Sequence, residues 1–197
     1  MRFKFFGIEI YISFLFFAAL TIMLATDKTG FALPCVTAVV FHELGHLFMM
    51  WVRECAPRSI KLIPATVQIT ASFIKDYKTD ILVAIAGPAV NLIMFAALFY
   101  NYLCFNNETT LYYALVNLIY GVFNLLPVKG LDGGTVLLSV LSKFYDINKA
   151  ALLLKFITFA LAVGIIVTAV MFSLKGTNNI SFYIIGIYLL VVGIMKM

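Results

Sequence analysis

The chain has 197 residues, of which 63% are hydrophobic and only 12% are charged. A soluble domain carries about twice that charged fraction, so the composition excludes an ordinary soluble enzyme. Fourteen Lys and Arg against nine Asp and Glu give a net charge of +5. In so apolar a chain this excess indicates membrane topology, so we expect the lipid bilayer as a partner and no nucleic acid.

Six apolar blocks are long enough to cross a bilayer, which takes about twenty residues. They cover about Ile8–Ala25, Phe31–Val52, Ile81–Leu103, Thr110–Leu126, Ala150–Leu174 and Ile180–Ile194. The first block is too long for a signal-peptide core and no A-x-A cleavage site follows it, so we expect it to be retained. The sequence therefore predicts an all-α polytopic membrane protein with six transmembrane helices.

The basic residues orient this bundle. With the N-terminus in the cytosol, twelve of the fourteen Lys and Arg lie on the inner side, and only Lys28 and Lys175 lie outside. This distribution follows the positive-inside rule, and an even number of spans returns the C-terminus to the same side. We therefore predict an integral, multi-pass membrane protein with both termini in the cytosol.

The second block contains the motif His42-Glu43-Leu44-Gly45-His46, which uses both histidines of the sequence. On a helix, residues four apart lie on one face, so the two imidazoles can bind one metal ion. The pattern H-E-x-x-H on a helix is typical of zinc metalloproteases, with the glutamate as general base. The alternatives are two histidines that only make core hydrogen bonds, or a metal site without catalysis, which has no use for Glu43.

The depth of this motif in the membrane also favours a functional role for its histidines over a purely structural one. His42 lies ten residues before the inner end of its block, which is roughly 15 Å above that end at 1.5 Å per residue. Ionisable groups at this depth are costly unless they face a protein interior or a water-filled cavity. We therefore predict an active site inside the membrane, toward the cytosolic side.

The segment between the second and third blocks alternates apolar and polar residues from position 67 to 73, with Val67, Ile69 and Ala71 apolar. This period of two predicts a strand, which can pair with Ser59–Ile63 as a short membrane-associated β-hairpin. An exposed edge of that strand could hold an unwound substrate by β-addition. A plain hairpin that only connects two spans is an equal alternative.

A catalytic zinc ion usually has three protein ligands and an open position for water, yet the chain has no third histidine. The fourth block runs into the segment from Asn124 to Gly134, which descends to the same membrane level as the histidines. Its proline and glycines break the helix there. Asp132 is the candidate third ligand, although aspartate before glycine is also a common turn residue. The scattered cysteines, Cys35, Cys55 and Cys104, show no metal-ligand spacing.

Three separated motifs resemble the site-2 proteases, the intramembrane zinc metalloproteases of peptidase family M50. They are His42-Glu43-Leu44-Gly45-His46, Ala86-Gly87-Pro88-Ala89-Val90-Asn91, and Asn124-x-x-Pro127 followed by Leu131-Asp132-Gly133. The resemblance implies one protease domain over residues 1–197 with a catalytic core at about residues 31–134. The compact architecture is most similar to stage IV sporulation protein FB and its relatives, from which Lys129-Gly130 departs. No CBS or PDZ domain is expected.

The resemblance implies that His42, His46 and Asp132 bind one Zn²⁺ per chain and that Glu43 is the general base. It also implies that Asn91 holds the oxyanion, on a third span that Gly87-Pro88 opens locally. An interhelical hydrogen bond is the equal alternative for Asn91. Asn124 could orient Asp132 or a substrate backbone, or cap the broken fourth helix.

The expected function is that of a zinc metalloendopeptidase of the bacterial cell membrane. It would cleave transmembrane or membrane-tethered proteins within the bilayer, such as a pro-sigma or anti-sigma factor, under the control of a membrane partner or of a prior cleavage. One alternative is an inactive relative that binds transmembrane partners, which the presence of Glu43 disfavours. Another is a metal or ion transporter, which would more often show repeated halves. A prenyl-protein protease would need a later intramembrane glutamate, and Glu54 and Glu108 lie at span ends.

Overall fold

The computed structural model describes residues 2–5, 8–55, 57–63, 66–71, 76–174 and 180–194. The chain divides into two compact units, Met1–Phe123 and Asn124–Met197. Most of the described residues are helical, as the apolar blocks predict, and a small sheet belongs to the first unit.

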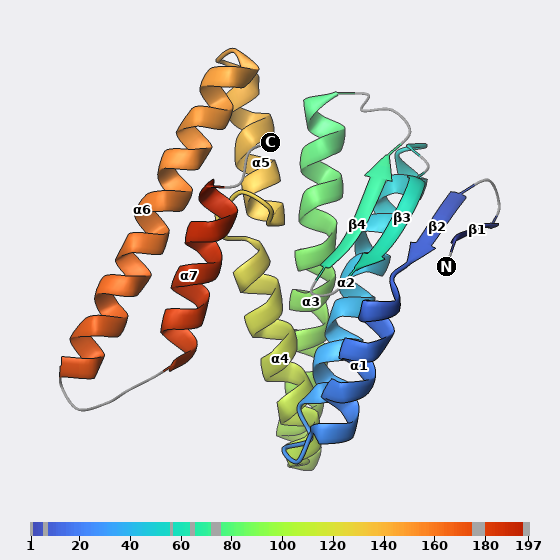
Figure 1. Ribbon diagram of the computed structural model, residues 1–197. Helices are drawn as coiled ribbons and strands as arrows, with labels where there is room; N and C mark the ends of the chain where they lie inside the picture. The colour runs from blue at the N-terminus through green and yellow to red at the C-terminus, as the bar shows by residue number, and fades with distance from the viewer. Residues whose placement is uncertain are drawn as a thin grey trace. The chain divides into compact units, whose positions relative to one another are not determined.

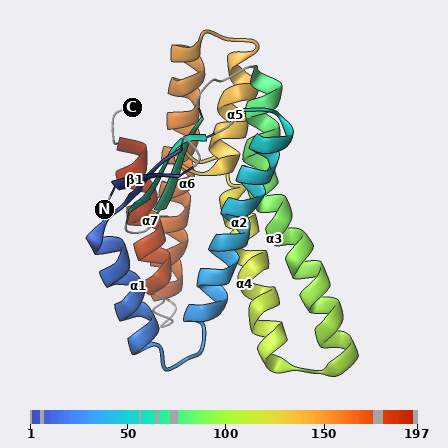
Figure 2. The same ribbon diagram turned by 90° about the vertical axis from the view of Figure 1, so that its right-hand side faces the viewer.

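Four helices follow one another through the first unit: α1 (Phe14–Thr26), α2 (Ala32–Val52), α3 (Tyr77–Phe105) and α4 (Glu108–Asn124). The helices α2 and α3 pack along each other, and α3 and α4 run in opposite directions from the turn that joins them (Figure 2). Gly45 permits the α2–α3 contact, because a Cβ atom there would lie 2.6 Å from the carbonyl oxygen of Ala86. A small residue is therefore required at this crossing.

The carboxylate of Asp27 organises the loop before α2. Its Oδ1 accepts hydrogen bonds from the hydroxyl of Thr29 and from the backbone N–H groups of Thr29 and Gly30, at 2.7, 2.8 and 3.0 Å. Its Oδ2 accepts one from the backbone N–H of Ala32 at 2.8 Å. The Thr29 hydroxyl first, and then the backbone donors, lower the pKa of Asp27 from 3.8 to about 2. The start of α2 is thus fixed by a carboxylate that stays charged at ordinary pH.

The sheet has four strands in the order β1 (Arg2–Phe5), β2 (Ile8–Ile12), β3 (Pro57–Ile63) and β4 (Thr66–Ala71) (Figure 1). The strands β3 and β4 form the antiparallel hairpin that the alternation predicts, with Ile60 opposite Ile69. The strand β2 pairs with β3 in parallel, and β1 pairs with β2 antiparallel. The predicted hairpin is confirmed for these residues, while residues 72 and 73 of the predicted strand lie outside the described ones.

The first apolar block begins as a strand, so the prediction of a span over Ile8–Ala25 was wrong at its N-terminal end. Ile8–Ile12 forms β2, and α1 starts only at Phe14. The reason is that apolar residues alternate with Glu9 and Tyr11, and β3 supplies backbone partners for this period of two. The average hydropathy of the block hides the alternation. The protein is therefore mostly helical with a sheet, rather than all-α.

The second unit contains the helices α5 (Asp132–Ser142), α6 (Ile147–Leu174) and α7 (Ile180–Ile194). The helix α6 packs against both α5 and α7, and α5 and α6 run antiparallel from a short turn (Figure 1). Thr158 is fully buried in α6, and its hydroxyl oxygen accepts a hydrogen bond from the backbone N–H of Lys129 at 3.0 Å. The segment that leads into α5 is thereby tied to α6.

Three of the described helices, α2, α3 and α6, are long and apolar enough to cross a membrane by length and composition. The helix α1 has 13 residues, and α4 and α7 have 17 and 15 described residues. A straight helix needs about 20 residues to span the hydrocarbon layer. The structure thus supports membrane-spanning character for three of the six predicted spans, and the other three stay a prediction.

Candidate metal centre

His42 and His46 lie one turn apart on α2, and their imidazole rings meet edge to face with centroids 4.7 Å apart. The two Nε2 atoms are 3.1 Å apart. Two nitrogen ligands of one tetrahedral Zn²⁺, each about 2.05 Å from the ion, are separated by about 3.3 Å. The two imidazoles are therefore spaced as ligands of a single ion.

Hydrogen bonds at the other ring nitrogens determine which atom of each imidazole carries the hydrogen. Nδ1 of His46 lies 2.8 Å from the backbone carbonyl oxygen of Val83, which can only accept, so this Nδ1 is the donor. Nδ1 of His42 lies 2.7 Å from Oδ1 of Asn91 and donates to it in the same way. A neutral imidazole then has its lone pair at Nε2. Two such lone pairs 3.1 Å apart repel each other, and either a metal cation or a shared proton between them relieves the repulsion.

Asn91 is completely buried on α3, and its partners set the orientation of its amide. Nδ2 donates to the carbonyl oxygen of Ala38 at 3.0 Å and to Oδ1 of Asn117 at 2.9 Å. Because both N–H bonds are aimed at acceptors, the amide oxygen faces His42. This geometry supports the interhelical hydrogen bond that was the alternative for Asn91, and its oxyanion role stays a prediction.

Gly87 gives α3 its close approach to the two imidazoles. A Cβ atom at this position would lie 2.5 Å from Nε2 of His46 and 2.9 Å from Cε1 of His42. The helix continues through Gly87 and Pro88. The expectation that these two residues open the third span was therefore wrong, because the surrounding packing keeps the helix continuous around one missing N–H group.

Glu43 follows His42 directly on α2 and is half-buried. Successive helix residues point about 100° apart, so Glu43 flanks the face that presents the two histidines. A carboxylate beside a metal-binding face can act as a general base, and this role of Glu43 stays a prediction.

Sequence reasoning missed three groups that surround the histidines. They are the carbonyl of Val83, the amide of Asn117 and the ring of Tyr120, whose centroid lies 4.9 Å from that of His42. A backbone carbonyl has no signal in the sequence. Asn117 does have one, because a lone asparagine in an apolar helix must find polar partners.

Asp132 is the first residue of α5, with Leu131 as the N-cap. The amide dipoles at the start of a helix stabilise negative charge, which favours the carboxylate form of a metal ligand. The segment before it is compact: the N–H of Val128 donates to the carbonyl of Leu126 at 2.7 Å, and that of Leu131 donates to the carbonyl of Val128 at 3.1 Å.

Two glycines make this turn possible. A Cβ atom on Gly133 would overlap the carbonyl oxygen of Leu125, and one on Gly134 would overlap the carbonyl oxygen of Val128. The backbone of the turn is therefore packed directly against the first turn of α5. The main-chain packing of this turn consequently helps to fix the position of Asp132.

Asn124 is the last residue of α4, and its side chain is buried. The predicted cap of the fourth helix stays a prediction. The other predicted roles, orienting Asp132 or a substrate backbone, stay predictions.

The strand β4 contains Val67, Ile69 and Ala71 and lies at the edge of the described sheet. An edge strand has N–H and C=O groups that can pair with a further strand. The geometry is therefore compatible with β-addition of a substrate, and the substrate role of these residues stays a prediction.

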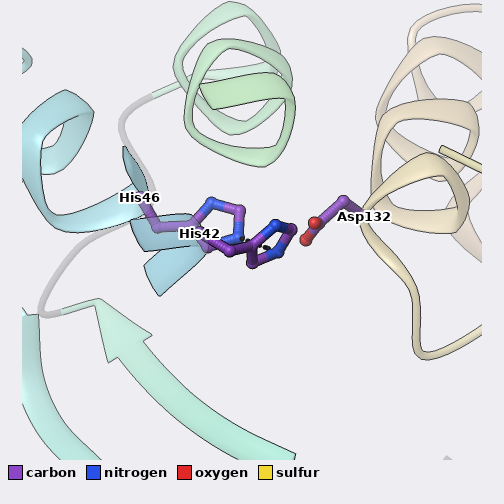
Figure 3. A group of neighbouring side chains, drawn as sticks. All are labelled: His42, His46 and Asp132. Carbon is purple, nitrogen blue, oxygen red and sulfur yellow. Dashed lines mark hydrogen bonds between the residues drawn. The ribbon is translucent and has the colours of Figure 1, made fainter. Parts of the chain in front are cut away.

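Among the described residues, His42, His46 and Asp132 form the candidate metal-binding group, and Figure 3 shows their side chains. Two imidazole nitrogens and one carboxylate oxygen form a ligand set of catalytic zinc sites, which leave a fourth position open. The donor chemistry fits Zn²⁺, because both imidazoles have their lone pairs at Nε2 and the carboxylate lies at a helix start.

Comparison with known proteins adds three relationships. Residues 106–172 match peptidase family M50. The chain is 32% identical over 163 residues to a zinc metalloprotease of Methanocaldococcus jannaschii, covering 75% of this chain and 47% of that protein. It is 34% identical over 121 residues to a curated protein of Synechocystis sp., covering 55% of this chain and 30% of that protein. The chain thus spans less than half the length of these curated relatives.

The fold is similar to the solved structure of a site-2 protease from Methanocaldococcus jannaschii. The TM-score is 0.73 and the sequence identity is 24%, over 100% of this chain and 97% of that one. The likeness at this identity shows the fold.

Proposed function

We propose that this chain, of which residues 106–172 match peptidase family M50, is a zinc-dependent protease that cuts membrane-embedded or membrane-tethered proteins. The main support is the pair of Nε2 atoms on α2, 3.1 Å apart, with both Nδ1 atoms bonded to other groups. With both lone pairs at Nε2, that pair can bind one cation. The proposed catalytic core is residues 31–134.

In the proposed mechanism, His42, His46 and Asp132 hold one Zn²⁺, which when bound supplies Lewis-acid activation of water and of the scissile carbonyl. Glu43 accepts the proton of the attacking water. The same carboxyl group then donates that proton to the leaving amine, so that one water is consumed for each peptide bond cut. Asn91 and the carbonyl of Val83 keep each imidazole in the tautomer that leaves Nε2 available.

A helical substrate must unwind before this chemistry, because its peptide groups are bonded within the helix. We propose that the edge of β4, at Val67, Ile69 and Ala71, pairs with the unwound stretch through main-chain hydrogen bonds. Asn124 as an orienting group belongs to the same proposal. An oxyanion role for Asn91 would require one of its N–H groups to leave Ala38 or Asn117, so we assign Asn91 to holding His42.

For location, we propose a multi-pass protein of the bacterial cell membrane with six spans. The distribution of Lys and Arg supports cytosolic termini and an active site toward the cytosol, and three long apolar helices support the membrane location. A pro-sigma or anti-sigma factor is the proposed type of substrate, as in the sporulation branch of the family. Control by a membrane partner or by prior cleavage completes the proposal.

The test is co-expression with candidate single-span substrates, comparing the wild type with Glu43→Gln. Loss of the base should lower cleavage by about 10²–10⁴-fold, while the zinc content stays equal because Glu43 is not a ligand. Glu54→Gln is the matched control, since Glu54 is exposed just beyond the end of α2 and should retain both properties.

Wild-type cleavage by Glu43→Gln would remove Glu43 from the mechanism. A purified wild type without zinc would overturn the metalloprotease proposal. Equal absence of cleavage in both proteins, with normal zinc, would instead favour an inactive relative that binds transmembrane partners.

A further inference from the structure

We infer that Asn117 of α4 is a positioning residue for the metal site: it fixes the amide of Asn91 and, through it, the tautomer of His42. The inference rests on the proposed function, because it concerns the zinc affinity of the histidine pair. It gives a role in the site to α4, a helix that contributes none of the proposed zinc ligands.

The hydrogen bonds of Asn117 define which end of its amide faces α3. Its Nδ2 donates to the backbone carbonyl of Tyr113 at 2.9 Å, one turn earlier on α4. A carbonyl can only accept, so Oδ1 of Asn117 is left to face Asn91, whose Nδ2 donates to it at 2.9 Å. Two fixed backbone carbonyls therefore orient the amide of Asn91: that of Ala38 directly, and that of Tyr113 through Asn117.

The second step joins Asn91 to the metal-binding face. With both N–H bonds of Asn91 directed at Ala38 and Asn117, its Oδ1 can only accept the hydrogen of Nδ1 of His42, at 2.7 Å. A flipped Asn91 would present an N–H group to His42 and would draw the hydrogen of that imidazole to Nε2. A protonated Nε2 cannot bind a metal ion. Asn117 and the carbonyl of Ala38 both oppose this flip, because the Asn91 oxygen would then face two acceptors, and loss of Asn117 removes half of that opposition.

Burial makes the hydrogen bonds between Asn117, Asn91 and His42 hard to replace. The exposed fraction is 0% for Asn91 and 1% for Asn117, so solvent cannot replace a lost partner. Gly121 lies one turn after Asn117, and a Cβ atom there would lie 3.1 Å from Cβ of Asn91. Tyr120 on the same part of α4 contacts the ring of His42. One face of α4 thus packs against both His42 and Asn91: Tyr120 contacts the ring of His42, and Asn117 and Gly121 contact Asn91.

The test compares full-length wild type, Asn117→Leu and the control Asn101→Leu, which places the same substitution at an exposed position of α3. The dissociation constant for Zn²⁺ is measured in detergent by competition with a chelator. We expect Asn117→Leu to bind zinc about tenfold more weakly, at the low end of the effect of residues that orient metal ligands. Asn101→Leu should bind as the wild type does.

A second measurement separates positioning from simple destabilisation. The chain has two histidines, so protein labelled with ¹⁵N-histidine gives only two imidazole spin systems. In the metal-free protein in mildly alkaline buffer, His42 should have its hydrogen on Nδ1 in the wild type and in Asn101→Leu. In Asn117→Leu it should give a mixture of both tautomers. If Asn117→Leu does not fold, Asn117→Ala removes the same acceptor with less bulk and is measured in its place.

A folded variant with wild-type zinc affinity and a single Nδ1–H tautomer at His42 would overturn the inference and leave the proposed function intact. A wild type that binds no zinc would instead overturn the proposed function itself.

Discussion

The proposed zinc ligands in the two units, His42 and His46 in the first and Asp132 in the second, are each positioned by different physical means. The two imidazoles are held by the hydrogen bonds that their Nδ1–H groups donate to acceptors on α3, namely Oδ1 of Asn91 and the carbonyl of Val83. Asp132 depends on the backbone, because the carbonyls before it occupy the space that a larger residue at Gly133 would need. A side chain can rotate to relieve a disturbance, whereas a packed main chain has to move as a whole. Substitutions around the histidines should therefore weaken zinc binding gradually, whereas substitutions in the turn before Asp132 should nearly abolish it.

The largest effect should come from Gly133→Ala. The added Cβ atom overlaps the carbonyl oxygen of Leu125, so the turn has to shift and takes Asp132 with it. We expect zinc affinity to fall by more than about 100-fold, beyond the range for residues that only orient ligands. Zinc content per chain after dialysis and the temperature of unfolding are the measurements.

Gly164→Ala is the control for this substitution, because a Cβ atom at Gly164 meets nothing within 4 Å. It should keep its zinc and gain about 0.5–1 kcal/mol of stability from the better helix propensity of alanine. A Gly133→Ala protein with normal zinc content would show that main-chain packing does not position the carboxylate.

An intermediate effect is expected for Gly87→Ala in the first unit. Its Cβ atom would lie 2.5 Å from Nε2 of His46, but the imidazole can rotate away at some cost in ligand geometry. We expect zinc to bind about 10–100-fold more weakly, with the protein still folded. The same chelator titration measures this, again beside Gly164→Ala. A complete loss of zinc from Gly87→Ala, as severe as that expected for Gly133→Ala, would contradict the claim that the histidines tolerate substitution better than the turn before Asp132. The tenfold effect expected for Asn117→Leu is the smallest of the series.

The parts of the site that a sequence can reveal are those set by local periodicity. The spacing of His42 and His46 places both imidazoles on one helix face, and the alternation around Ile69 gives the hairpin of β3 and β4. The carbonyl of Val83 could not be predicted, because a backbone acceptor is the same in every residue. Asn117 was visible as an isolated polar group, but its partners come from a helix distant in sequence.

The fold shows the same division. The apolar block that begins at Ile8 has the hydropathy of a membrane span, yet Ile8–Ile12 pairs with β3, about fifty positions later in the chain. Non-local strand pairing leaves only a weak alternation of apolar and polar residues in the sequence. Averaging the hydropathy over the length of a membrane span hides that alternation. Length decides whether a helix can span: α4 and α7 have 17 and 15 described residues, and a bilayer requires about 20.

The measurement that tests the central claim most directly is X-ray absorption at the zinc edge of the purified protein, with zinc counted per chain. One Zn²⁺ bound to two imidazole nitrogens at about 2.0 Å and to carboxylate oxygen is the predicted result. Asp132→Asn should lose that oxygen and bind zinc far more weakly, while Asp146→Asn, an exposed control before α6, should match the wild type. A wild-type spectrum without imidazole ligands, or one that Asp132→Asn leaves unchanged, would contradict the account.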